Sequence, residues 1–343
     1  MKTQKNITKS ELFFSAIRRA DIASVERFLS QGVDWEASGE DNETPLYLAV
    51  QTGKWKLIRL LVRQGVDALE VFEYSPSPLN WALETGQTDL ARYLFREAHK
   101  AGVGELWGIA ALRFDARRGA LDSVQWLVNH GVNLLSKENG FPVLYYAAQS
   151  GNLALMKYLI EEHREDFQQT DYLQDGNLLL YAAQSGSLEM VQWLAETLHL
   201  SVYFKDNRDC TLLHFAARAG SRELVEWLVK EKKIDVNAET NYAPYETLNL
   251  CPIHEAAAGK HWDIVRWLIE QGADVNADSG WVYKDFQVIL TAIMHGDLEM
   301  TQWLLCHGAK QSKDKLLKFA SEQHQPEILH WLENQPLDSQ TES

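Results

Sequence analysis

The chain has 343 residues, of which 45% are hydrophobic and 24% are charged. These proportions are typical of a soluble folded protein and exclude intrinsic disorder as its general state. The formal net charge of −15 argues against general binding to nucleic acid or to a membrane surface, unless basic residues cluster on one face.

Other broad features point to the cytoplasm. No stretch approaches the ~18 consecutive apolar residues of a membrane helix, and the first residues lack the apolar core of a secretory signal peptide. The three cysteines, Cys210, Cys251 and Cys306, are too widely spaced for a disulfide framework. We therefore expect a protein of the reducing cytoplasm.

One pattern recurs ten times along the chain: a small apolar pair, two variable residues, a turn residue and an apolar cluster. The first copy reads SAIRRADIASVERFL, and later copies include LAVQTGKWKLIRLL and YAAQSGSLEMVQWL. The turn residues, which we call the turn column, recur at intervals near 33 residues. They are Ala20, Gly53, Gly86, Gly119, Gly151, Gly186, Gly220, Lys260, Gly296 and His324.

Each copy predicts two short helices. The first ends at the turn column, where glycine closes a helix at little steric cost. The second carries an apolar stripe, as at Leu57, Ile58, Leu60 and Leu61. Because neither helix can bury its stripe alone, neighbouring copies must stack into an elongated all-α solenoid.

Short motifs within the copies resemble the ankyrin-repeat family. Residues 44–49 read TPLYLA, residues 211–217 read TLLHFAA and residues 251–257 read CPIHEAA, close to the family consensus TPLHxAA. Residues 272–277 read GADVNA, which is similar to the family's exit loop. The Trp- and Tyr-rich second helices look like those of bacterial and viral ankyrin arrays. The resemblance implies hairpin, helix, turn, helix and loop in each unit, stacked into a curved array.

The expected domain organisation is a single ankyrin-repeat solenoid at 10–335, after a flexible N-terminus at 1–9 and before a disordered tail at 336–343. Three departures from the repeat are visible in the sequence. They are an irregular segment at 98–108, where no hairpin motif occurs, and insertions at 238–251 and 279–286.

Catalytic motifs are not found. The sequence has no HExxH, P-loop or GxSxG motif and no cysteine pair with zinc spacing, and Gly102-Val-Gly104 is only half of a dinucleotide fingerprint. We expect a protein that is not an enzyme, with no cofactor, no metal and no small-molecule substrate. The resemblance assigns His214 and His254 a structural role in bonding the hairpin backbone.

Tryptophan recurs seven residues after the turn column, on the second helix. We interpret these rings as filling the space between adjacent second helices, since a residue that occurs once per repeat usually serves stacking. The tryptophans are Trp126, Trp193, Trp227, Trp267, Trp303 and Trp331.

A candidate partner-binding groove follows from the resemblance, which places the first helices and hairpin tips on the concave face. Arginines precede the turn column there, above a row of aromatic residues, and both types are enriched at interface hot spots. This predicts a partner with an acidic or extended segment; alternatively, the aromatics simply cover neighbouring first helices. The groove candidates are Arg18, Arg19, Trp81, Phe114, Arg117, Arg118, Tyr146, Tyr181, Phe215 and Arg218.

A second candidate surface lies at the two insertions. Aromatic residues on extended tips need either local packing or a partner, and we favour a partner. These tip candidates are Tyr242, Tyr245, Trp281 and Tyr283.

The sequence thus predicts a non-catalytic protein–protein interaction scaffold that is monomeric alone and binds no nucleic acid and no membrane. Two narrower hypotheses remain open. An effector exported into a host cell would occupy a host protein through Arg18, Arg117 and Arg118. An acidic immunity or inhibitor protein would instead neutralise a basic toxin or nuclease by charge complementarity. Such a toxin should meet the acidic cluster Glu36, Glu40, Asp41 and Glu43.

Overall fold

The computed structural model describes residues 8–34, 44–65, 77–100, 102, 104–135, 142–164, 177–240, 250–277 and 287–335. Within these ranges the regular structure is helical, and the one β-type pairing is an isolated bridge between Lys205 and Thr211. The predicted all-α class is confirmed. The chain divides into two compact units, residues 1–147 with 157–159, and residues 148–156 with 160–343.

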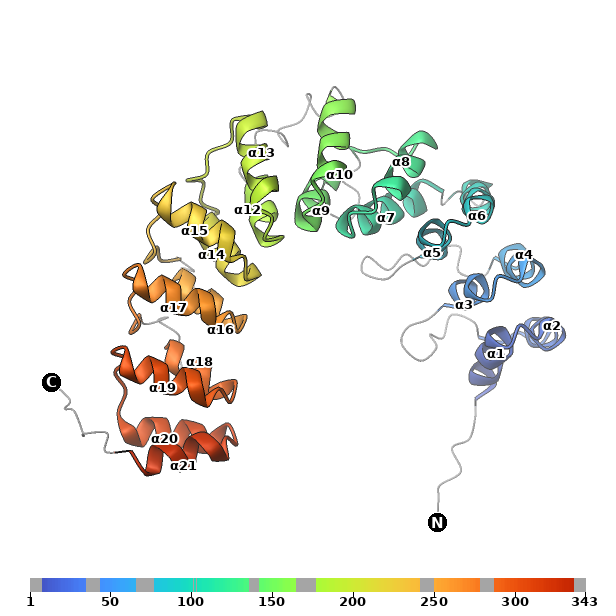
Figure 1. Cartoon of the computed structure of the whole chain (residues 1–343). Helices are drawn as coiled ribbons and strands as arrows, with labels where there is room; N and C mark the ends of the chain where they lie inside the picture. The colour runs from blue at the N-terminus through green and yellow to red at the C-terminus, as the bar shows by residue number, and fades with distance from the viewer. Residues whose placement is uncertain are drawn as a thin grey trace, which may run out of the picture. The chain divides into compact units, whose positions relative to one another are not determined.

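In the first unit, paired helices stack in two layers (Figure 1). First helices α1, α3, α5 and α7 each contact the next, and each also packs on its own second helix. The bounds are α1 Lys9–Arg18, α2 Ile22–Ser30, α3 Pro45–Gln51, α4 Trp55–Arg63, α5 Pro78–Glu84, α6 Thr88–Lys100, α7 Gly104–Arg117 and α8 Leu121–Asn129. Helix α9, Val143–Ser150, begins in this unit and ends in the second.

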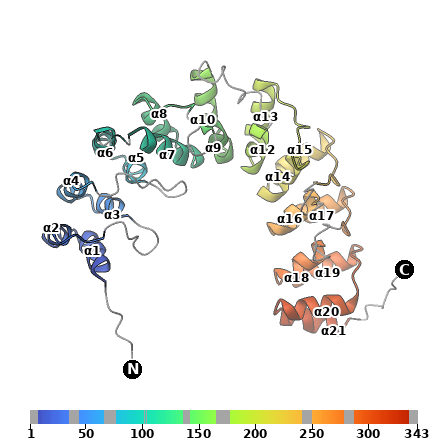
Figure 2. The same ribbon diagram turned by 180° about the vertical axis from the view of Figure 1, so that it is seen from behind.

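The second unit repeats the arrangement, with first helices α12, α14, α16, α18 and α20 in contact along the stack (Figure 2). Helix α10 is followed directly by a π-helical turn at Tyr158–Glu162. The bounds are α10 Leu153–Lys157, α12 Asn177–Gln184, α13 Leu188–Leu198, α14 Leu212–Ala219, α15 Arg222–Lys230, α16 Pro252–Ala258, α17 Trp262–Glu270, α18 Val288–Met294, α19 Leu298–Cys306, α20 Lys313–Glu322 and α21 Pro326–Glu333.

The turn column adopts the left-handed backbone conformation in all ten copies, with φ between +53° and +76°. At Gly86 an added β-carbon would meet no neighbouring atom, so the preference for glycine there comes from the backbone alone. Ala20, Lys260 and His324 adopt the same conformation despite carrying a β-carbon. The turn is therefore imposed by the stacking of the helices, and glycine makes it less costly.

Two histidines connect consecutive hairpins, as the resemblance implied. His214 Nδ1 accepts a hydrogen bond from the Thr211 amide at 3.1 Å, and its Nε2 donates to the Leu250 carbonyl at 3.0 Å. His254 repeats this one copy later, accepting from the Cys251 amide and donating to the carbonyl of Ala277 at 3.1 Å. Burial lowers the pKa of His214 to about 4, so the ring is neutral at pH 7 and can do both.

The apolar stripe of the second helix forms the core between copies. In α4, Leu57, Ile58 and Leu61 are fully buried, whereas Leu60 at the edge of the stripe is only half-buried. Near the irregular segment, Trp107 of α7 is buried as well. A β-carbon added at Gly108 would lie 2.7 Å from the Val132 side chain. Helix α7 therefore approaches the loop after α8 more closely than it could if position 108 held any residue other than glycine.

Rings of the tryptophan column meet residues of the preceding second helix, as Trp126 of α8 meets Phe95 of α6 with 5.8 Å between ring centres. Trp227 and Trp267 are 8% and 5% exposed, which confirms the structural interpretation for these two, while Trp126, Trp193, Trp303 and Trp331 are half-buried. Cations cover several rings: the guanidinium carbon of Arg222 lies 5.3 Å from the Trp267 ring centre, and that of Arg266 lies 5.5 Å from the Trp303 ring centre.

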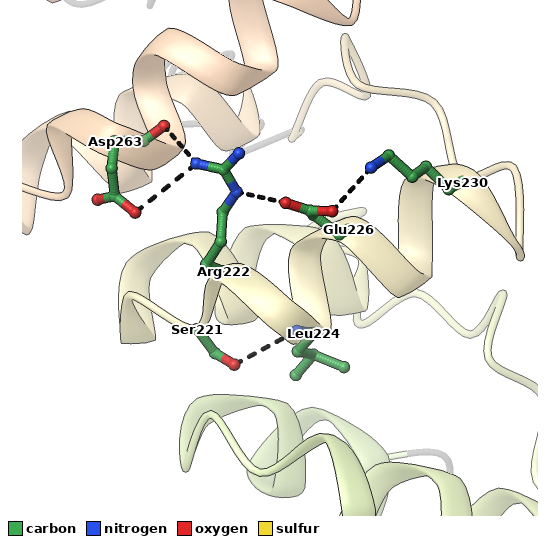
Figure 3. A network of polar contacts seen from close by, with 6 residues as sticks. All are labelled: Ser221, Arg222, Leu224, Glu226, Lys230 and Asp263. Carbon is green, nitrogen blue, oxygen red and sulfur yellow. Dashed lines mark hydrogen bonds and ion pairs between the residues drawn. The ribbon is translucent and has the colours of Figure 1, made fainter.

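Polar contacts accompany this stacking between α15 and α17 (Figure 3). Arg222 donates to Glu226 at 2.6 Å on its own helix and to the Asp263 carbonyl at 3.0 Å on α17. Lys230 donates to the same Glu226 at 2.7 Å, and its ammonium also lies 5.3 Å from the Trp267 ring centre. The carboxylate of Glu226 thus holds both Arg222 and Lys230 beside the Trp267 ring.

A buried carboxyl group lies within α7. Asp115 is 0% exposed, and neither of its oxygens has a hydrogen-bond partner among the described residues. The amide of the nearby Asn80 instead donates to the Ala111 carbonyl at 3.0 Å. Burial raises the pKa of Asp115 to about 7, and the positive charge of Arg118 opposes this only in part.

We expect Trp227→Ala to lower the local free energy of unfolding by about 3–5 kcal/mol, because it removes a buried ring and leaves a cavity. Hydrogen exchange of α15 and α17 measures this without assuming two-state unfolding. Trp55→Ala, at a ring that is 36% exposed, is the control and should cost far less. Equal losses in the two variants would contradict the assignment.

We expect the contribution of Asp115 to the free energy of unfolding to fall as pH rises from about 4 to about 7, opposite in sign to that of His214, whose lowered pKa favours the folded state as pH rises. In this window folded Asp115 keeps a proton that the unfolded chain has already released, so the unfolded state gains. Asp115→Asn should remove this dependence and stabilise the protein at pH 8, on the order of a few kcal/mol. Urea unfolding across this pH range checks it, with Asp122→Asn, at an exposed carboxyl on α8, as control. Parallel pH profiles for wild type and Asp115→Asn would refute the prediction.

Candidate functional site

The groove candidates of the first unit lie on the first-helix layer. Trp81 on α5 and Phe114 on α7 are half-buried, so each ring leaves an edge open to solvent. Arg117 at the end of α7 is exposed, as are Arg18 and Arg19 at the end of α1. Because α5 and α7 pack directly on one another, Trp81, Phe114 and Arg117 belong to two consecutive copies of one surface.

Arg118 is already engaged with the neighbouring copy. Its guanidinium forms a two-point ion pair with Glu84 at the end of α5, at 2.7 and 2.8 Å. The same guanidinium carbon lies 5.4 Å from the centre of the Phe114 ring. Arg118 therefore links α5 to α7 and contributes less free positive charge to this surface than the sequence suggests.

The second unit shows a similar arrangement. Tyr181 on α12 and Phe215 on α14 are half-buried, and Arg218 lies 3.7 Å from the carboxylate of Glu255 on α16. Burial raises the pKa of Glu255, and the Arg218 guanidinium partly opposes this. Tyr146 on α9, which belongs to the first unit, differs from the other aromatics because it is buried. It is therefore positioned for packing more than for contact with a partner.

Several predicted residues lie outside the described residues. These are the tip candidates Tyr242, Tyr245, Trp281 and Tyr283, and the acidic cluster Glu36, Glu40, Asp41 and Glu43.

A pocket of about 360 Å³ lies beside the loops that follow α13 and α15. Its wall includes Tyr203, which is 63% exposed and donates its hydroxyl hydrogen to the Lys232 carbonyl at 3.1 Å. Ile234 is the buried apolar member of the lining. Charged side chains of both signs complete the pocket. The full lining is Tyr203, Lys205, Thr211, Lys233, Ile234, Asp235, Asn237, Ala238 and Glu239.

Lys233 in this pocket has a strained backbone, with φ of +55°. The sequence 233–237, KIDVN, aligns with 272–276, GADVN, so Lys233 occupies the register of the exit-loop glycine. Gly272 adopts φ of +96° at the equivalent position. The alignment was visible in the sequence, but only the fold shows that this lysine lines a cavity.

No group of three or more His, Cys, Asp or Glu side chains among the described residues is arranged to hold a metal ion. None of the described helices is long and apolar enough to cross a membrane.

Comparison with known families identifies one match. A family model described as ankyrin repeats, in three copies, matches residues 12–105, 97–171, 179–279 and 253–340. Together these segments include nearly all of the chain between residues 12 and 340. No curated protein matches the chain.

We expect Lys233→Gly to raise the free energy of local unfolding by up to about 1 kcal/mol, because glycine adopts the left-handed conformation without strain. Lys260→Gly in the turn column, at φ of +60°, is a matched control outside the pocket and should act similarly. Thermal unfolding measures both variants, with hydrogen exchange of residues 228–240 for Lys233→Gly and of residues 252–270 for Lys260→Gly. Destabilisation by Lys233→Gly alone would show that the lysine side chain contributes contacts that outweigh its backbone strain.

Proposed function

The chain belongs to the ankyrin-repeat family, and we propose that it is a non-catalytic scaffold that binds a partner protein through its first-helix layer. Ankyrin repeats are in general protein–protein interaction modules. The proposal concerns the binding face and holds whether the protein acts in the cytoplasm of its own cell or in that of a host.

The observation that carries the proposal is the surface formed by α5 and α7. Trp81 and Phe114 lie half-buried on consecutive first helices, and the exposed Arg117 follows Phe114 by three residues, about one turn, on α7. Aromatic rings held by their neighbours lose little conformational entropy when a partner binds, so they suit an interface centre. Arg117 supplies a charge at its rim.

The partner that fits this surface has an acidic or extended segment. Arg117 and Arg118 are both exposed at the end of α7, and Arg118 is also paired with Glu84 on α5. A carboxylate of the partner can therefore meet two exposed guanidinium groups at α7, and at Arg118 it competes with Glu84. This argues for a focused acidic contact at α7 and against a basic toxin bound at the same place.

We expect Arg117→Glu to abolish capture of the partner while changing the free energy of unfolding by less than about 0.5 kcal/mol, because the side chain is on the surface. Affinity purification followed by mass spectrometry, with wild type alongside, measures the capture. The double variant Arg117→Glu with Arg118→Glu is not expected to identify partners of this face better than Arg117→Glu alone. The reason is that Arg118→Glu also places a second carboxylate beside Glu84.

The control is the exchange Glu84→Arg with Arg118→Glu, which keeps net charge and restores the ion pair in reverse. Proteins that are lost with Arg117→Glu but retained with the exchange are partners of this face. If the same proteins survive Arg117→Glu, or if the variant unfolds, the proposed binding face is wrong.

A further inference from the structure

A basic patch lies on the opposite, second-helix layer of the first unit, on α4 and α6. Residues 54–63 and 88–100 hold seven lysines and arginines and two carboxylates, a net charge of +5 in a chain of −15. We define the α4 patch as Lys54, Trp55, Lys56, Arg59 and Arg63, all of which are exposed. Basic residues therefore cluster on one face, although the net charge of the whole chain is negative.

The carboxylates of α6 do not neutralise α4. Asp89 pairs with Arg92 at 3.0 Å, and Glu97 pairs with Lys100 at 2.7 Å and with Arg96 at 3.4 Å, all on α6 itself. Among the described residues no ion pair involves Lys54, Lys56, Arg59 or Arg63. Within the part of the chain that the structure describes, the four cations of α4 are therefore available to a partner.

Aromatic rings hold part of the patch in a fixed arrangement. The Arg59 guanidinium carbon lies 5.5 Å from the Trp55 ring centre and 5.8 Å from the Tyr93 ring centre. The two rings themselves meet edge to face, 5.7 Å apart. A guanidinium held between two rings presents its N–H groups in one orientation, which favours recognition of a carboxylate.

The charges of α4 lower the local stability of this helix. Lys54 occupies its N-cap without any side-chain hydrogen bond, and its first turn contains no acidic residue. Cations at a helix N-terminus oppose the helix dipole, and like charges three or four residues apart, as at Lys56, Arg59 and Arg63, repel.

The other described second helices begin differently. Each has either a side-chain cap, as at Asp21, Ser187, Ser221 and Asp297, or a carboxylate in the first turn, as at Asp89, Asp122, Asp263 and Glu327; α10 is capped by Asn152. Folding alone therefore does not explain the two lysines at the start of α4.

We propose that the α4 patch is a second binding surface that takes a short acidic peptide segment of a partner protein. The size of the patch favours a short ligand: nine helical residues span about 14 Å, the length of about four extended residues. Exposed carboxylates lie on the second helices that flank α4 and α6, Glu26 on α2 and Asp122 on α8. Since the rest of the chain is strongly acidic, it would repel an extended polyanion or a membrane plane.

The test uses the full-length chain and a fluorescein-labelled peptide of about eight alternating Asp and Glu residues with one central Leu, followed by fluorescence anisotropy. We expect binding that weakens steeply as salt rises from about 50 to about 300 mM. Lys56→Glu with Arg63→Glu should weaken it at least about tenfold. Lys310→Glu with Lys318→Glu, at exposed sites of the second unit, makes the same change in net charge and should leave binding within about twofold of wild type.

Lys54→Ser separates binding from folding, because it supplies the missing N-cap while removing a cation. We expect this variant to melt at a higher temperature and to bind the peptide more weakly. Arg117→Glu, on the other layer, should leave peptide binding unchanged, so failure of the first-layer proposal and failure of this one are distinguishable.

The proposal is overturned if wild type does not bind the peptide, or if the control pair weakens binding as much as the α4 pair. It is also overturned if Arg117→Glu removes binding while the α4 variants keep it. Phosphatidylserine vesicles or poly-uridine that bind more tightly than the peptide, with the same dependence on α4, would assign the patch to a membrane or a nucleic acid instead.

Discussion

The stacking of each helix pair on the next is the interaction on which every other feature of this protein depends. Each helix is short and carries a single apolar stripe, so it has no core of its own and is stable only between neighbours. Buried side chains such as Leu57 and Ile58 in α4 therefore stabilise the neighbouring copies as well as the copy to which they belong. The register in which neighbouring helices pack in turn determines the position of each surface residue.

Stacking in register requires a left-handed backbone conformation at the turn column, which strains residues that carry a β-carbon. Most copies use glycine in the turn column, but Ala20, Lys260 and His324 adopt the same left-handed conformation. His214 and His254 reinforce the registration by hydrogen bonds from one hairpin to the next. These bonds need a neutral ring, and burial ensures it at His214 by lowering its pKa.

Charge is distributed unevenly on this scaffold, in ways that follow from the stacking. Adjacent copies bring Arg118 to Glu84, Arg218 to Glu255 and Arg222 to Asp263, so many charges are used in joining one copy to the next. The exposed cations of α4 form no ion pair among the described residues. They are the charges that the second proposed binding surface uses.

The sequence by itself determined the helix pairs, the register of the turns and the family, because these depend on local periodicity and on backbone conformations that recur in every copy. It also identified the hairpin histidines and the tryptophan column. Only the tertiary structure decided which of these charges are paired: Arg118 and Arg218 read as free arginines in the sequence, yet each meets a carboxylate more than thirty residues away. The burial of Asp115 and the pocket around Lys233 depend equally on contacts between copies. Residue spacing along one helix carries no information about such contacts, since they arise from the geometry with which neighbouring helices pack.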